Sequence, residues 1–142
     1  MKHGVIVPDA SVILKWAFNA VPDEHDSAKA EILLEGWVAG EYEILLPGLW
    51  VFEVANVLGM KVPEMAGSLM EVFIDYRFPS VEITQTLCVK TFEIMKRCGA
   101  TFYDAVYHAL AIKHKGLLVT ADEAYYKKVK GSGHIMLLKD FR

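Results

Sequence analysis

The regular alternation of short apolar segments with longer segments of helical periodicity constrains the fold more than any other feature of this chain. The short segments lie at residues 5–7, 44–46, 117–119 and 135–138, with a small edge strand expected at 81–83, and no hairpin dipeptide joins any two of them. Helices are expected at residues 11–18, 26–38, 49–58, 63–76, 86–97, 101–116 and 123–130. Strands that are apolar throughout and separated by helices are typical of a parallel sheet covered on both faces. The chain is therefore predicted to be an α/β protein, a three-layer α/β/α sandwich around a central, mainly parallel sheet.

Length and composition predict a single globular domain. A chain of 142 residues is long enough to bury a full core, so we expect residues 1–142 to form one domain. The 54% content of hydrophobic residues excludes a disordered chain and favours an oligomer in which some apolar surface meets a partner. The most apolar window, residues 44–60, is too short to span a membrane, and the N-terminal apolar run is too brief for a secretion signal. A cytoplasmic protein is expected, with Cys88 and Cys98 reduced and buried because their spacing fits no zinc site.

The two halves of the chain carry opposite net charge. Residues 1–75 contain four lysines and twelve acidic residues, a charge of −8, whereas residues 76–142 contain eleven basic and six acidic residues, a charge of +5. The lysines that stand out in the second half are Lys113, Lys115, Lys127, Lys128, Lys130 and Lys139. Such a surface is suited to a polyanion, although a solvated lysine face is the commoner explanation.

Three aspartates occupy positions where α/β folds collect chemistry. Asp9 and Asp122 each follow a predicted parallel strand, and ligands of open α/β sheets bind at the carboxyl ends of the strands. Asp104 lies three residues after Thr101, in the first turn of a predicted helix. Each aspartate taken singly is more often a helix cap than a ligand, so their interest depends on whether they converge.

Glu53 is harder to explain as a structural residue. It lies in the predicted helix 49–58, which is apolar all round and is therefore expected to be buried. A buried carboxylate needs a cation, hydrogen bonds or a raised pKa, and no lysine or arginine lies within one turn of Glu53. If Glu53 meets the three aspartates, a divalent ion would offset their repulsion, and oxygen ligands select Mg²⁺ or Mn²⁺ over zinc.

Four segments of the sequence together resemble the PIN-domain nucleases, and more narrowly the VapC-like toxins of VapBC toxin–antitoxin pairs. They are residues 7–16, which contain Asp9; 47–58, which contain Glu53; 101–111, which contain Asp104; and 118–122, which end at Asp122. Successive acidic residues are separated by 44, 51 and 18 positions, and the resemblance extends over essentially the whole chain.

This resemblance implies a divalent-metal-dependent ribonuclease that acts as the toxin of a toxin–antitoxin pair. The implied acidic set, both catalytic and metal-binding, with its two polar supports, is Asp9, Glu53, Asp104 and Asp122, supported by Ser11 and Thr120. The resemblance also implies a homodimer and a cognate antitoxin whose C-terminal segment enters the active-site groove. Residues 59–64 lack the basic stretch often found there in the family, so RNA contacts are expected mainly from the later lysines.

Hydrolysis by metal-activated water requires no protein nucleophile, and Mg²⁺ or Mn²⁺ is the expected cofactor. We expect Asp9 and Asp104 to coordinate the ion directly. Glu53 and Asp122 are expected to hold it through water or to orient the attacking water.

Other interpretations remain beside this one. A catalytically weak or inactive module that binds metal, RNA or a protein in the same acidic pocket is the main alternative. A phosphotransfer domain fits poorly, because Asp9 is followed by Ala10 and Ser11 rather than by a second acid. His108 is expected to be a packed or hydrogen-bonded helix residue, and Tyr103 and Tyr107 to be core or interface residues more often than base-stacking ones.

Overall fold

A parallel sheet forms the centre of the molecule. The computed structural model describes residues 4–18 and 25–142. Four strands, β1 (Val5–Pro8), β2 (Glu43–Ile44), β5 (Leu117–Thr120) and β6 (Ile135–Leu137), lie in the order β2-β1-β5-β6. Every neighbouring pair is parallel, with Ile6 opposite Ile44 and Leu117, and Leu118 opposite Ile135. The prediction of a mainly parallel central sheet is confirmed.

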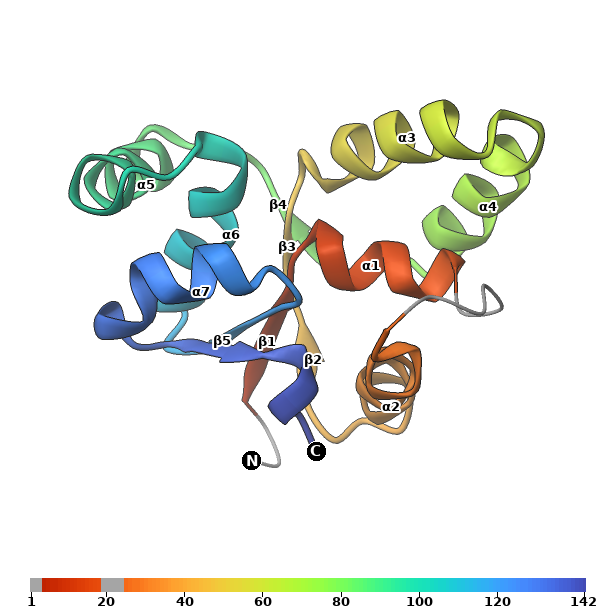
Figure 1. Ribbon diagram of the computed structural model, residues 1–142, viewed down its shortest axis with the longest axis horizontal. Coiled ribbons are helices and arrows are strands. Elements are labelled where there is room, and N and C mark those ends of the chain that lie inside the picture. The colour runs from red at the N-terminus through yellow and green to blue at the C-terminus, as the bar shows by residue number, and fades with distance from the viewer. Residues whose placement is uncertain (1–3, 19–24) are drawn as a thin grey trace.

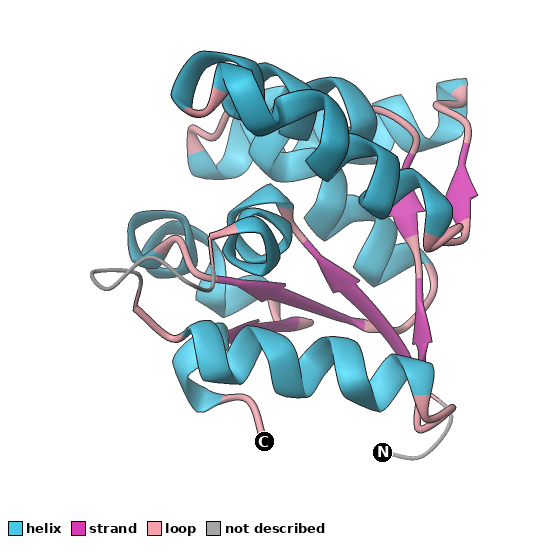
Figure 2. Ribbon diagram, turned by 90° about the vertical axis from the view of Figure 1, so that its right-hand side faces the viewer, coloured by secondary structure: helices cyan, strands magenta, loops and turns pink. Residues whose placement is uncertain are grey.

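Helices cover the sheet on both faces. They are α1 (Ala10–Ala17), α2 (Ser27–Val38), α3 (Trp50–Lys61), α4 (Pro63–Asp75), α5 (Gln85–Cys98), α6 (Phe102–Lys113) and α7 (Glu123–Val129), with short 3-10 helices η1 (Lys130–Ser132) and η2 (Leu138–Asp140). Figure 1 shows α1 to α4 on one side of the strands and α5 to α7 on the other. In Figure 2 the strands run between the helices, as the predicted three-layer α/β/α sandwich requires.

The segment predicted as one strand at residues 44–46 belongs to two sheets. The Leu45 N–H donates to the Ile6 carbonyl in the main sheet (3.1 Å), whereas the Leu46 N–H donates to the Pro79 carbonyl (3.0 Å). From there β3 (Leu46–Pro47) pairs in parallel with β4 (Ser80–Val81), which is the edge strand predicted at 81–83. The apolar pattern is continuous across this change of partner, so periodicity alone does not reveal it.

The helix predicted at 49–58 is longer and less buried than expected. It extends to Lys61 as α3 and buries only the side that carries Trp50, Val54 and Leu58, while Phe52 is 77% exposed. The prediction of an all-round buried helix is wrong, because α3 packs against α1 and α4 on one side and faces solvent on the other. The helix with the larger buried surface is α6, whose residues 105–111 are all buried.

Two smaller findings complete the fold. Cys88 and Cys98 are free thiols, as predicted, but each is half-buried rather than buried. Across residues 4–18 and 25–142, every helix is too short or too polar to cross a membrane.

Candidate active site

The four predicted carboxylates come from four separate elements that meet at one edge of the sheet. Asp9 directly follows β1, and Asp122 follows β5, the strand paired with β1, so both lie at the same carboxyl edge. Glu53 lies in the first turn of α3 and Asp104 in the first turn of α6, and Figure 1 shows these two helices on opposite sides of the strands. The helices therefore bring Glu53 and Asp104 to the aspartates that the strands position.

Charge interactions link the four carboxylates in pairs. The negative charges of Asp104 and Glu53 raise the pKa of Asp9, and Asp104 raises the pKa of Glu53. Asp122 in turn raises the pKa of Asp104. For all three of these shifts burial is the larger cause, because a carboxylate loses its hydration there. The site is thus both partly desolvated and crowded with like charge.

Asp9 is the most deeply buried member of the set. Its side chain caps α1 by accepting a hydrogen bond from the Ser11 N–H (3.0 Å), and the Ser11 hydroxyl donates to the same oxygen, Oδ1. Burial raises its pKa to about 6 despite the opposing hydrogen bonds from Ser11 and Thr120. Asp9 is therefore a helix cap and a member of the acidic group at once, and the two interpretations do not compete.

Ser11 and Thr120 join the turn after β1 to the turn after β5. The Ser11 hydroxyl oxygen accepts from the Ala121 N–H (2.9 Å), and Thr120 Oγ1 accepts from the Asp122 N–H (3.0 Å). The two hydroxyl oxygens are 3.5 Å apart. These bonds fix the backbone around Asp9 and Asp122, which is the supporting position expected for both residues.

Glu53 has a partner that sequence reasoning missed. The hydroxyl of Tyr107 donates to Glu53 Oε1 at 2.7 Å, and the Tyr107 side chain is only 1% exposed. Burial and the nearby carboxylates raise the pKa of Tyr107 far above its usual range, so it remains a donor. The sequence feature that could have indicated Tyr107 is its position three residues after Asp104, which places both residues on one face of α6.

Asp104 and Asp122 differ in the hydrogen bonds that they form. Asp122 caps α7 by accepting from the Tyr125 N–H (3.0 Å). Asp104 uses its backbone N–H to bond the Thr101 hydroxyl (3.3 Å), and a hydrogen bond from Thr101 to its carboxylate lowers its pKa against the larger effect of burial. Asp104 is half-buried, and no lysine or arginine of the described residues is ion-paired with its carboxylate.

His108, on the same helix, serves a structural role. Its Nε2 lies 2.8 Å from the Gly133 carbonyl, and its Nδ1 lies 3.0 Å from the Tyr125 hydroxyl. A carbonyl only accepts, so Nε2 carries the proton, and Nδ1 accepts from Tyr125 because burial lowers the pKa of His108 and keeps it neutral. The expectation of a packed, hydrogen-bonded histidine is confirmed.

The chemistry of the donor set fits a hard divalent cation. All four side chains offer oxygen, and within the described ranges none of them is ion-paired with a lysine or arginine. In residues 4–18 and 25–142, no three His, Cys, Asp or Glu side chains are arranged closely enough to hold an ion together. A cation bound at this edge would offset the mutual repulsion of the carboxylates, which Lys128 offsets only in part at Asp104.

Comparison with known proteins decides the family. A PIN domain profile matches residues 6–131, which covers most of the chain. The chain belongs to the PIN domain family. No curated protein sequence matches it significantly.

Several solved structures share the fold of this PIN domain. The VapBC2 structure from Rickettsia felis, bound to a promoter DNA fragment, has a TM-score of 0.67 at 17% identity, covering 94% of this chain and 96% of that one. A toxin–antitoxin complex from Klebsiella pneumoniae has a TM-score of 0.65 at 18% identity, with coverage of 94% and 97%. VapC20 of Mycobacterium tuberculosis, a toxin that cleaves the sarcin–ricin loop, has a TM-score of 0.64 at 16% identity, with coverage of 91% and 95%. At these identities the likeness establishes a shared fold.

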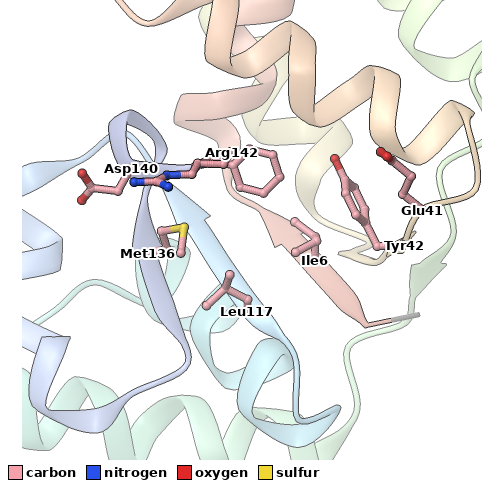
Figure 3. A pocket seen from close by; sticks show the side chains of 8 residues that line it. Ile6, Glu41, Tyr42, Leu117, Met136, Asp140 and Arg142 are labelled. Atoms are coloured by element: carbon pink, nitrogen blue, oxygen red, sulfur yellow. The ribbon is translucent and has the colours of Figure 1, made fainter. Parts of the chain in front are cut away.

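A separate hollow of about 680 Å³ lies on another part of the PIN domain (Figure 3). Ile6, Leu117 and Met136 from three strands form its floor, and Tyr42 and Arg142 lie at its rim. None of the four carboxylates lines it. Its floor is apolar and it lies apart from the carboxyl ends of the strands, so we assign the candidate site to the acidic edge instead.

Proposed function

We propose that this PIN domain is a divalent-metal-dependent ribonuclease that hydrolyses RNA phosphodiester bonds. The observation that supports the proposal most directly is the convergence of Asp9, Glu53, Asp104 and Asp122 at the carboxyl edge of the sheet, where each carboxylate lacks a basic ion-pair partner in the described part of the chain. Carboxylates that are partly buried and close to one another reduce the stability of the folded protein, and such groups are often found at functional sites.

Within this site we assign different roles to the four carboxylates. Asp9 and Asp104 would hold Mg²⁺ or Mn²⁺ directly, and Glu53 and Asp122 would hold it through water or orient the attacking water. When bound, such an ion supplies Lewis acidity toward phosphate oxygens and lowers the pKa of a water molecule. Ser11 keeps the Asp9 carboxylate in one orientation, and Tyr107 does the same for Glu53 by donating to Oε1. Preorganised oxygens reduce the reorganisation that ion binding and attack on phosphorus require.

The related structures support a proposal for the substrate and the partners. RNA is the proposed substrate because VapC20, which shares this fold, is a toxin that cleaves the sarcin–ricin loop. A cognate antitoxin is proposed because related chains were crystallised in toxin–antitoxin complexes. A homodimer is supported by exposed apolar side chains such as Phe52 and Met60 on α3, each 77% exposed.

The direct test is cleavage of a labelled RNA pool by the purified protein. With Mg²⁺ or Mn²⁺ we expect fragments to accumulate, and with EDTA we expect the rate to fall at least about tenfold, since the proposed chemistry needs the ion. A DNA pool of the same sequences tests the preference for RNA. If calorimetry shows that RNA and Mn²⁺ bind but no fragments form with either ion, the chain is a binding module and the nuclease proposal is wrong.

Tyr107→Phe tests whether Tyr107 positions Glu53. Loss of a hydrogen bond of about 1–2 kcal/mol to a charged group is expected to lower kcat roughly tenfold with little change in KM. Because the Tyr107 hydroxyl lowers the pKa of Glu53, its removal should also move the acidic limb of the pH–rate profile to higher pH. Tyr42→Phe is the matched control, since its hydroxyl bonds the Leu33 carbonyl (2.5 Å) away from the site. Equal kcat values and pH profiles for the two variants would exclude a positioning role.

A further inference from the structure

A basic hollow lies where α5, α6 and α7 meet. Its volume is about 530 Å³, and Arg97, Lys128 and Ser132 line it together with the apolar side chains of Ile112 and Val129. No acidic side chain contributes to its lining. Figure 1 shows these three helices grouped on one side of the sheet.

The two cations of the hollow are largely free to bind a ligand. Arg97 donates from Nη2 to the Ser132 hydroxyl (3.1 Å), which fixes the guanidinium and leaves its other N–H groups without a partner among the described residues. Lys128 Nζ lies 3.5 Å from the Gly99 carbonyl, a long contact with a neutral group. Neither cation forms an ion pair with a carboxylate of the described residues. Their charge is therefore not neutralised within the described part of the chain.

The hollow adjoins the acidic site. Lys128 lies six residues after Asp122 on α7, which corresponds to about 9 Å along a helix axis. Burial raises the pKa of Asp104, and the positive charge of Lys128 lowers it by a smaller amount. A helical nucleic-acid strand advances about 3.4 Å per nucleotide, so this separation spans two to three nucleotides.

We propose that the Arg97–Lys128 hollow binds a backbone phosphate of the RNA, two to three nucleotides from the bond that is cleaved. The guanidinium of Arg97 suits two phosphate oxygens at once, and Lys128 adds a point charge. Contacts of this kind set the position of the strand without reading its sequence. The inference rests on the proposed ribonuclease function for the identity of the polyanion. RNA is favoured over an acidic peptide because its charge repeats at every nucleotide and its chain must already reach the neighbouring carboxylates.

Binding measured without cleavage tests this proposal independently of catalysis. The affinity of a fluorescent single-stranded RNA is measured in EDTA at several salt concentrations for the wild type and the Arg97→Gln/Lys128→Gln variant. We expect the variant to bind roughly tenfold more weakly, and its slope of log affinity against log salt to fall by about 0.7 for each phosphate that it no longer neutralises. Lys61→Gln/Arg77→Gln, which removes the same charge from two exposed positions, at the end of α3 and just after α4, is the control and should bind almost as the wild type does. Circular dichroism melting confirms that both variants are folded.

The outcomes separate this inference from the proposed function. Weaker binding by the hollow variant alone supports the inference, and it does so even if no protein cleaves RNA with Mg²⁺, a result that would overturn only the nuclease proposal. Equal loss in both double variants would show a diffuse basic surface and overturn the inference. Unchanged RNA binding with lost binding of a polyglutamate peptide would overturn it in favour of an acidic protein partner. With Mg²⁺ present, a raised KM at nearly constant kcat for the hollow variant is the expected kinetic counterpart.

Discussion

Asp104→Asn is expected to reduce RNA cleavage roughly a thousandfold while leaving the free energy of unfolding within about 1 kcal/mol of the wild type. The large effect follows because Asp104 is one of the two carboxylates proposed to hold the ion directly, so the substitution removes ligand charge at the ion itself. A loss of about 4 kcal/mol in transition-state stabilisation corresponds to this factor. The fold is retained because the helix cap uses the Asp104 backbone N–H and the Thr101 hydroxyl, which the substitution leaves in place.

The measurement is kcat/KM for a labelled RNA with Mn²⁺, together with a thermal melt of each protein. Asp140→Asn is the matched control, because Asp140 is an exposed acidic residue that lies in η2 and lines the separate hollow. Its cleavage rate should equal that of the wild type. Cleavage by Asp104→Asn at the wild-type rate would remove Asp104 from the metal-binding set.

The sequence predicts the two aspartates at strand ends well because one geometric rule covers them. Asp9 and Asp122 follow paired parallel strands, and parallel strands end at a common edge, so their meeting depends only on the strand assignment. Asp104 and Glu53 required the family resemblance, since no local rule says where the first turns of α6 and α3 come to lie. The structure places both beside Asp9, where their charges raise its pKa.

Features that depend on long-range packing lie outside what the sequence reveals. The hydroxyl of Tyr107 reaches Glu53 across 54 positions, and Leu46 leaves the main sheet for a strand that lies more than 30 residues further on. Local periodicity also overstated the burial of Glu53, because it describes how apolar a helix is and not how many neighbours cover it. Glu53 is half-buried on a helix whose Phe52 is exposed, and a tyrosine hydroxyl satisfies it instead of a cation.

The protein without metal is expected to lose stability as the pH rises through 6, and added Mg²⁺ or Mn²⁺ is expected to restore it. Burial raises the pKa of Asp9 from 3.8 to about 6, so the folded state binds this proton more tightly than the unfolded state does. The contribution of Asp9 to stability is therefore greatest below pH 4 and is lost between about pH 4 and 6, a total of roughly 3 kcal/mol. Glu53 and Asp104, whose pKa values are also raised, act in the same direction.

His108 opposes this trend, so the experiment needs a reference protein. Burial lowers the pKa of His108, and its contribution to stability is lost as the pH falls below the unfolded value of 6.5. Asp9→Asn leaves His108 unchanged and keeps a good helix cap, because asparagine also accepts from the Ser11 N–H. The difference in unfolding free energy between the wild type and Asp9→Asn, measured by urea denaturation in EDTA, isolates Asp9. Between pH 8 and 5 this difference should move in favour of the wild type by roughly 1–2 kcal/mol.

Metal addition should reverse the loss of stability, because a bound cation offsets the negative charge of the carboxylates at neutral pH as protonation does at acidic pH. At pH 8, an ion present at a hundred times its dissociation constant should stabilise the wild type by about 2.7 kcal/mol. The gain should shrink at pH 5, where protonated carboxylates no longer bind the ion, and it should be much smaller in Asp9→Asn at either pH. Equal stabilisation of the two proteins by Mn²⁺ at pH 8 would mean that the ion binds away from Asp9. A difference in unfolding free energy that stays constant from pH 8 to 5 would show that Asp9 is already ionised in the folded protein throughout this range, and that crowding at the edge of the sheet does not require a cation.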